Sequence, residues 1–178
     1  MIVCNTSRLR LRYLTPDDAP FMLELLNDPS FIANVADRGV RTPEDARTYI
    51  IEGPMASYER HGFGLYLVEL VETGVPIGIC GLLKRDHLDA PDVGFAFLPA
   101  YWSKGYARES AAAVMQLGRE GFGLTRIVAI TAPHNHASMR VLESLGLSCA
   151  GRVRSADDGG DSMLFTPDGR DGEVPSHA

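Results

Sequence analysis

The stretch that decides the fold is Trp102-Ser103-Lys104-Gly105-Tyr106-Ala107-Arg108-Glu109. An apolar run over residues 93–98 precedes it, and small or apolar residues at helical spacing follow it. A strand therefore leads through a short loop into a helix. The first N–H groups of a helix lack partners within the helix, and the helix dipole adds about half a positive charge there. Because Gly105 and Ala107 leave these amides uncovered, we expect a phosphate group to bind at this helix start.

Composition bounds the class of protein. The chain has 178 residues, 45% of them apolar and 22% charged, which is typical of a globular protein. We expect a single domain over residues 1–166 and a polar, flexible tail over 167–178. The net charge of −6 argues against general nucleic-acid binding and slightly favours a cationic partner. Without an apolar run near the ~20 residues of a membrane span, or a signal-peptide pattern, a cytoplasmic protein without a membrane partner is expected.

Cysteine and histidine residues give no sign of a metal site. The three cysteines, at positions 4, 80 and 149, are odd in number and widely separated, as expected of reduced thiols. His134 and His136 flank Asn135, but a third ligand does not lie nearby in the sequence. A solvated loop is the favoured interpretation of this pair, and we predict no bound metal.

Helix and strand signals alternate along the chain. Strands are expected over residues 8–14, 63–70, 76–83, 93–98, 126–131, 148–153 and 162–166. Helices are expected after Thr15, after Thr42, after the 102–109 stretch and after Asn135. Residues 28–41 show no clean period, and Gly53-Pro54 should break or bend the second helix. This order predicts an α/β (α+β) fold in which helices cover a mixed sheet.

Three segments carry a resemblance to a known family. They are residues 92–95 (Asp-Val-Gly-Phe), 99–107 (Pro-Ala-Tyr-Trp-Ser-Lys-Gly-Tyr-Ala) and 135–147 (Asn-His-Ala-Ser-Met-Arg-Val-Leu-Glu-Ser-Leu-Gly-Leu). Their order and separation resemble the GNAT superfamily of acyl-CoA N-acetyltransferases, in the branch of ribosomal-protein N-terminal (RimJ/RimL-like) acetyltransferases. The resemblance implies a mostly antiparallel central sheet that splays between its fourth and fifth strands, with helices on both faces.

The resemblance also implies acetyl-CoA as the co-substrate. Its pyrophosphate would lie on the loop amides, and its pantetheine arm would pair with the splayed strand end. The residues expected to bind it are Phe97, Leu98, Trp102, Ser103, Lys104, Gly105, Tyr106, Ala107 and Asn135. The amide of Leu98 would polarise the thioester carbonyl. Many family members carry Arg or Gln at the position of Trp102, and this branch tolerates Trp there.

Asp92 and Ser138 are the candidate catalytic residues. An amine attacks only when it is neutral, so a base that accepts its proton, often through water, assists the reaction. Asp92 is the first candidate base because it lies at the mouth end of the central strand, and Glu69 and the Asp157-Asp158 turn are alternatives. Many family members use a tyrosine as the acid where this chain has Leu142. In the related branch the serine three residues after the asparagine can take that role, and in this chain that residue is Ser138. Its hydroxyl could instead bond the helix backbone.

The sequence thus predicts an N-acetyltransferase that moves an acetyl group from acetyl-CoA to a primary amine by direct transfer in a ternary complex. A catalytically inactive CoA-binding sensor or scaffold is the alternative, because Leu142 occupies the position where many family members carry the tyrosine acid. No motif in the sequence identifies the acceptor, which could be a small molecule or a protein N-terminus. The sequence also leaves open whether the protein forms a homodimer. A nucleotide-binding P-loop is disfavoured because its glycine spacing and its Lys-Ser/Thr pair are missing here.

Overall fold

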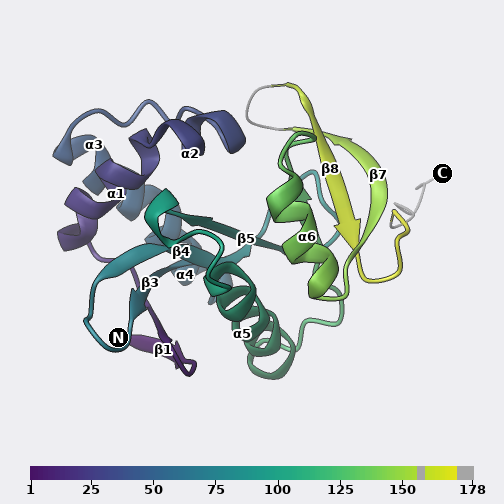
Figure 1. The fold of residues 1–178 in the computed structure, drawn as a ribbon, viewed down its shortest axis with the longest axis horizontal. Coiled ribbons are helices and arrows are strands. Elements are labelled where there is room, and N and C mark those ends of the chain that lie inside the picture. The colour runs from purple at the N-terminus through teal and green to yellow at the C-terminus, as the bar shows by residue number, and fades with distance from the viewer. Residues whose placement is uncertain (156–158, 172–178) are drawn as a thin grey trace.

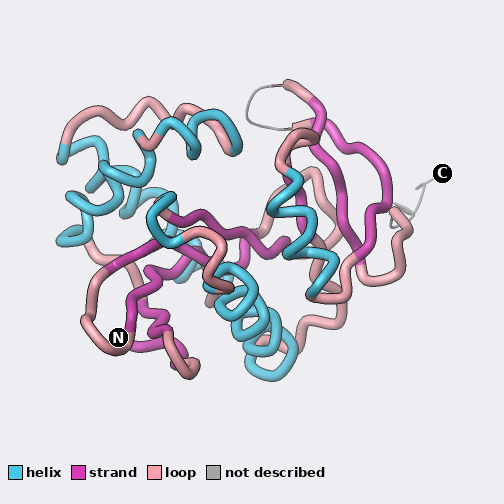
Figure 2. Tube along the Cα trace, in the orientation of Figure 1, coloured by secondary structure: helices cyan, strands magenta, loops and turns pink. Residues whose placement is uncertain are grey.

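The structure, a computed structural model, describes residues 1–155 and 159–171. Its strands are β1 Ile2–Asn5, β2 Leu9–Arg12, β3 Leu65–Leu70, β4 Pro76–Leu83, β5 Asp92–Phe97, β6 Ala129–Thr131, β7 Ser148–Arg154 and β8 Asp161–Thr166. Its α-helices are α1 Ala19–Asn27, α2 Pro29–Asn34, α3 Pro43–Ile50, α4 Ala56–His61, α5 Tyr106–Gly121 and α6 His136–Ser144. Short 3-10 turns lie at Pro16–Asp18 and Pro99–Tyr101. Figure 1 shows this arrangement, and Figure 2 shows the same view by element type.

Two sheets meet beside β5. Strands β1 to β5 form an antiparallel sheet in chain order, and β6, β8 and β7 form a second sheet. They touch through a parallel bridge between Asp92 and Val128, where the Val93 N–H donates to the Val128 carbonyl at 2.9 Å. Beyond this bridge, the described residues of β5 and β6 do not pair. The predicted splay between the fourth and fifth expected strands, which are β5 and β6, is confirmed.

Helices cover both faces of the five-stranded sheet, as predicted. Successive side chains of a strand point to opposite faces. Val68 and Cys80 therefore belong to a core with the apolar face of α5, whereas Leu67 and Ile79 belong to a second core with α1 and α3. In Figure 1, α1 to α3 lie to the left of β5, α5 lies below it and α6 lies to its right, with β7 and β8 beyond α6. β5 is therefore the edge strand next to the second sheet, and a site between the two sheets would include it.

The helix starts follow the predicted capping signals. The Thr42 hydroxyl accepts from the Asp45 N–H, and the Asp45 carboxylate accepts from the Thr42 N–H. Gly53-Pro54 bends the second helix without ending it. The backbone widens into a π-turn over Ile51–Met55, because Pro54 has no N–H to donate, and it continues as α4. Of the two outcomes expected at Gly53-Pro54, a break or a bend, the structure therefore excludes the break.

Other differences from the sequence prediction have physical causes. β1 was not predicted, and its position depends on pairing with β2. α2 forms in the aperiodic segment because Asp28 caps it through the Ser30 N–H. The strand expected over residues 126–131 shortens to β6, although Ile127 and Val128 stay buried, because β8 pairs only from Ala129 onward. The Asp157-Asp158 turn and residues 172–178 of the expected tail lie outside the described residues.

Among the residues that the structure describes, no helix combines the length and the apolar character that crossing a membrane requires.

Candidate active site

The loop between β5 and α5 presents free backbone amides. Ser103 and Gly105 adopt left-handed backbone conformations, with φ of 59° and 82°. The first helical bond of α5 runs from the Glu109 N–H to the Gly105 carbonyl at 3.0 Å. Within the described chain, the N–H groups from Ser103 to Arg108 therefore donate to no protein acceptor. The loop that the sequence singled out has the geometry of an anion site, with N–H donors at the positive end of a sixteen-residue helix.

Arg8, just before β2, supports this loop from behind. Its guanidinium donates to the Lys104 carbonyl at 2.9 Å and lies 4.5 Å from the centre of the Tyr106 ring. It also pairs with Glu109 at 2.7 Å, and Glu109 accepts from the Thr6 hydroxyl at 2.6 Å. The turn between β1 and β2 is thus tied to the start of α5. No local pattern indicates this network, because its members are about 100 positions apart and meet only in the folded sheet.

A cavity of about 650 Å³ lies over the loop, between α2 on one side and α6 on the other. Of the residues expected to bind the co-substrate, seven line it: Phe97, Trp102, Ser103, Gly105, Tyr106, Ala107 and Asn135. Leu98 and Lys104 do not line it. The structure therefore brings most of the predicted set to one groove.

The pairing register of β4 and β5 determines which backbone N–H groups of β5 face the splay. The Leu98 N–H donates to the Ile77 carbonyl of β4 at 3.1 Å, so it is not free to polarise a thioester carbonyl, and that prediction is wrong. In an antiparallel ladder, alternate residues direct their N–H groups to opposite edges. Val93 donates toward β6, and by the same alternation the N–H groups of Phe95 and Phe97 face the splay. The Phe97 carbonyl accepts from the Trp102 indole N–H at 2.8 Å, which fixes the turn after β5.

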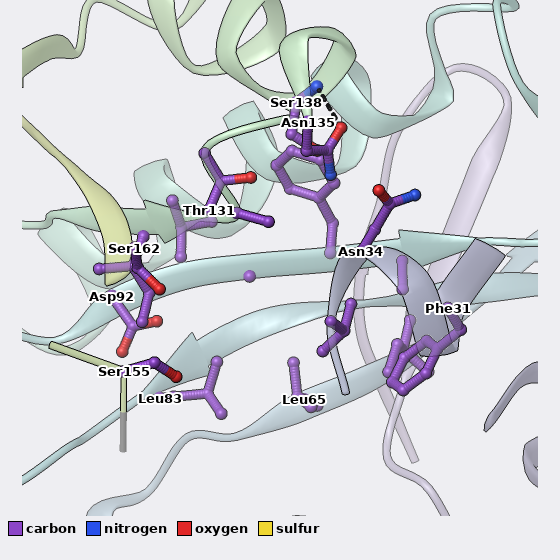
Figure 3. A pocket seen from close by; sticks show the side chains of 18 of the residues that line it. Phe31, Asn34, Leu65, Leu83, Asp92, Thr131, Asn135, Ser138, Ser155 and Ser162 are labelled. Carbon is purple, nitrogen blue, oxygen red and sulfur yellow. Dashed lines mark hydrogen bonds between the residues drawn. The ribbon is translucent and has the colours of Figure 1, made fainter. Parts of the chain in front are cut away.

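A second, smaller cavity of about 190 Å³ contains Asp92. Asp92 begins β5, is only 2% exposed, and its two carboxylate oxygens lie 3.1 and 3.2 Å from Nε of Arg85. Burial raises the pKa of Asp92, and the charge of Arg85 opposes this rise. Figure 3 shows Asp92 with Ser155 and Ser162 at one end of this pocket and Asn135 with Ser138 at the other. Sequence reasoning missed Arg85, which follows β4 and reaches Asp92 only through the pairing of β4 with β5.

The two cavities share one wall. The residues that line both are Phe31, Asn34, Val35, Phe95, Ala96, Asn135 and Ser138. Asn135 is the cap of α6, as predicted, and its side-chain oxygen accepts from the Ser138 N–H at 3.2 Å. The Ser138 hydroxyl donates to no described residue, so it is available at this junction.

His134 lies just before α6 and contacts α2, beside the shared wall of the two cavities. Its Nε2 lies 3.1 Å from the Ala33 carbonyl oxygen and 3.1 Å from the Asn34 side-chain oxygen. The ring is exposed, as expected of a loop residue, but it is also a cross-link between two walls of the larger cavity. Across the described ranges, no group of three or more His, Cys, Asp or Glu side chains is placed to hold a metal ion.

The alternative bases lie elsewhere. Glu69 on β3 pairs with Arg12 at 2.7 Å and with Arg10 at 3.9 Å, and it lines neither cavity. The Asp157-Asp158 turn lies outside the described residues. Leu142, at the position where related proteins carry a tyrosine, is 2% exposed and packs in the core with α5. Among the candidates that the structure describes, Asp92 is the carboxylate that lines a cavity.

A splayed sheet, an amide-lined loop and a groove between them are the features of an acyl-CoA-dependent transferase. The sequence matches the Acetyltransferase (GNAT) domain over residues 8–148. It is 29% identical to the uncharacterized N-acetyltransferase YnaD of Bacillus subtilis (strain 168), over 80% of this chain and 81% of that protein. The chain belongs to the GNAT family and is an acetyl-CoA-dependent acetyltransferase.

Solved structures share the fold. A GNAT-family acetyltransferase from Bacillus anthracis superposes with a TM-score of 0.76 at 26% identity, covering 93% of this chain and 97% of that one. RimL, the ribosomal L7/L12 alpha-N-protein acetyltransferase solved in complex with coenzyme A, gives a TM-score of 0.80 at 18% identity, with coverage of 93% and 97%. The fold of this chain is therefore also that of the ribosomal-protein branch, as the sequence motifs predicted.

Proposed function

We propose that this protein acetylates a primary amine, on a small molecule or a protein N-terminus, by direct transfer from acetyl-CoA in a ternary complex. The observation that carries the proposal is the shared wall of the two cavities, at Phe95, Ala96, Asn135 and Ser138. A donor in the larger cavity and an amine in the smaller one would meet there. None of the three cysteines lines either cavity, which favours direct attack over a cysteine-bound acetyl intermediate.

The donor would be held by backbone groups. The free amides from Lys104 to Ala107 would bind its pyrophosphate, and hydrogen bonds to a charged group contribute about 1.5–3 kcal/mol each. The N–H groups of Phe95 and Phe97 face the splay, so they take the role that the sequence assigned to Leu98. One of them would polarise the thioester carbonyl, and the other would pair with the pantetheine arm as an added strand does.

Asp92 and Ser138 would move the protons. Asp92 lies three residues before Phe95, roughly 10 Å along the strand, so it would accept the proton of the acceptor ammonium through water. Its raised pKa makes it a stronger base than a solvated aspartate. The neutral nitrogen bonds to the carbonyl carbon and the carbon–sulfur bond breaks. Ser138 then donates its hydroxyl proton to the departing sulfur, and the proton that the nitrogen loses as it becomes the amide returns to Ser138 through water.

The test is release of the CoA thiol from acetyl-CoA against a panel of polyamines, amino sugars and peptides with free N-termini. We expect at least one amine to yield equal amounts of free thiol and acetylated product by mass spectrometry. Ser138→Ala should lower kcat by about a hundredfold, as the loss of a general acid does. The control is Thr48→Ala, an exposed hydroxyl on α3 outside both cavities. CoA binding without turnover across the whole panel would contradict the proposal.

A further inference from the structure

Asn34 is the polar side chain at the shared wall that has no part in the proposed reaction. Of the seven residues that line both cavities, three are polar: Asn34, Asn135 and Ser138. Asn135 caps α6 and Ser138 is the proposed acid, whereas Asn34 ends α2 on the other side of the larger cavity. In Figure 3, Asn34 lies at the end of the pocket that holds Asn135 and Ser138, away from Asp92. An acceptor amine that reaches the junction therefore meets Asn34.

His134 determines which way the side-chain amide of Asn34 points. The His134 Nε2 atom lies 3.1 Å from the Ala33 carbonyl oxygen and 3.1 Å from the Asn34 Oδ1 atom. A carbonyl oxygen can only accept a hydrogen bond, so Nε2 carries a proton and donates it. The same N–H would repel the NH2 group of Asn34, and it therefore holds the amide oxygen toward His134. The NH2 group points away from the imidazole, and it donates to no residue that the structure describes.

An amide NH2 group at the junction selects what the acceptor carries beside its nitrogen. This group offers only N–H donors, so it binds an oxygen and repels an ammonium. An alkyl polyamine has no oxygen near its amines, and it would leave the donor unpaired once it displaced the water there, which costs free energy. An oxygen on the carbon that carries the amine would make an unstable hemiaminal. The nearest stable position for the oxygen is therefore the next carbon atom.

This inference rests on the proposed function, because it concerns the acceptor of the same reaction. We infer that Asn34, oriented by His134, binds the acceptor, and that the acceptor is an amine with a hydroxyl or carbonyl oxygen on the neighbouring carbon. Amino alcohols and α-amino carbonyl compounds share this arrangement. The nitrogen attacks with its lone pair while the neighbouring oxygen accepts from the Asn34 NH2 group. Asn34 contacts the acceptor, and His134 is a positioning residue that acts through Asn34.

The experiment uses two pairs of amines of equal size that differ in the oxygen. Ethanolamine is compared with propylamine, and glycinamide with 2-methylpropylamine. The preference is the ratio of kcat/KM within a pair, from initial rates of CoA thiol release. The amines differ in basicity, but this difference is the same for every variant and cancels when preferences are compared. We expect wild type to prefer the oxygenated amine in at least one pair, and the pair that shows it distinguishes a hydroxyl from a carbonyl.

Variants of Asn34 test the contact itself. Asn34→Leu keeps the size of the side chain and removes the donor, so the preference should fall about three- to tenfold, as expected for one neutral hydrogen bond. Asn34→Asp replaces the donor by an acceptor and should lower the preference further, because a carboxylate attracts an ammonium. The matched control is Asn5→Leu, at an exposed position on β1 that lines neither cavity, and it should keep the wild-type preference.

Variants of His134 test the positioning role. His134→Ala removes the donor that holds the Asn34 oxygen, so the preference should fall about as far as in Asn34→Leu. His134→Gln should restore most of it, because the glutamine NH2 group reaches the position of the imidazole Nε2 atom and donates there. A merely structural role of His134 would lower kcat/KM for both members of a pair and leave their ratio unchanged. Equal loss of preference in His134→Ala and His134→Gln would overturn the positioning role.

The outcomes separate the inference from the proposed function. A wild-type enzyme that acetylates only polyamines, or shows no preference in either pair, would overturn the inference while leaving the acetyltransferase assignment intact. An unchanged preference in Asn34→Leu together with weaker CoA binding by calorimetry would also overturn it, because Asn34 would then act on the donor. Absence of turnover with every amine tested would overturn the inference together with the proposed function. Unchanged thermal melting of the variants shows that a lost preference is not a lost fold.

Discussion

Asp92 shows how one side chain can be both buried and reactive. A carboxylate that is 2% exposed would be costly to ionise without a partner, and Arg85 supplies the compensating charge. Burial still raises the pKa of Asp92 above that of a solvated aspartate, about 3.9. The group therefore gains its negative charge at a higher pH than an exposed aspartate does, closer to the pH at which an acceptor amine begins to lose its proton.

Asp92→Asn should remove the acidic limb of the pH–rate profile. A base acts only when it is deprotonated, so kcat/KM of wild type should rise with pH as Asp92 ionises. In Asp92→Asn this limb should vanish and kcat should fall about a hundredfold, while the limb from the acceptor's own amine stays. The control is Glu69→Gln, which removes a carboxylate that lines neither cavity and should keep the limb. Wild-type kcat/KM in Asp92→Asn would refute the role of Asp92.

Residues within motifs could be found from the sequence, and their partners could not. Asp92, Asn135 and Ser138 lie at positions that local patterns and the family resemblance define. Arg85 contacts Asp92 only because β4 and β5 pair in one particular register. The error at Leu98 has the same origin: a shift of one residue along a strand turns its N–H to the other edge. Register is a property of the folded sheet, and no local pattern specifies it.

At the scale of elements, the loop before α5 depends on one backbone conformation. Gly105 has a φ of 82°, where an L side chain is strained, and an added Cβ would lie 3.2 Å from Arg8 Nη2. Glycine thus permits the turn and leaves room for the guanidinium that supports it. The sequence predicted this loop and its helix, because the glycine, the small residues and the apolar strand before them are contiguous. It did not predict α2, and it left open whether the second helix continues as α4; both are six residues long and too short to show a helical period.

Gly105→Asp should abolish CoA binding by placing a carboxylate against the pyrophosphate and beside Arg8. We expect the affinity measured by calorimetry to fall by about a hundredfold or more, since an attractive contact becomes a repulsive one. Gly123→Asp is the matched control. Gly123 also has a positive φ, 65°, and a Cβ added there would have nothing within 4 Å, so this variant shares the strain of about 1–2 kcal/mol without the charge at the loop. Equal CoA affinity in the two variants would remove the loop from the binding site.

At the scale of the whole molecule, the site lies where two sheets separate. β5 belongs to the five-stranded sheet and β6 to the three-stranded one, and a single bridge at Asp92 and Val128 joins them among the described residues. The walls of the larger cavity come from α2, β5, α5 and α6, so a ligand there contacts elements on both sides of the splay. Such a ligand replaces the contacts that the missing strand pairing would have supplied.

CoA should therefore raise the stability of both sheets together. A ligand that binds only the folded state, at a hundredfold excess over its Kd, adds about 2.7 kcal/mol to the free energy of unfolding. For a chain of this length that corresponds to an increase in Tm of about 5–10 °C. Calorimetric melting should show one transition that moves as a whole, and CoA should raise the Tm of Gly105→Asp by no more than about 1–2 °C, because a hundredfold weaker Kd leaves about 0.4 kcal/mol of stabilisation. If CoA moved only one of two separate transitions, the ligand would be bound to one sheet alone, because a ligand that bridges the splay must be released before either side unfolds.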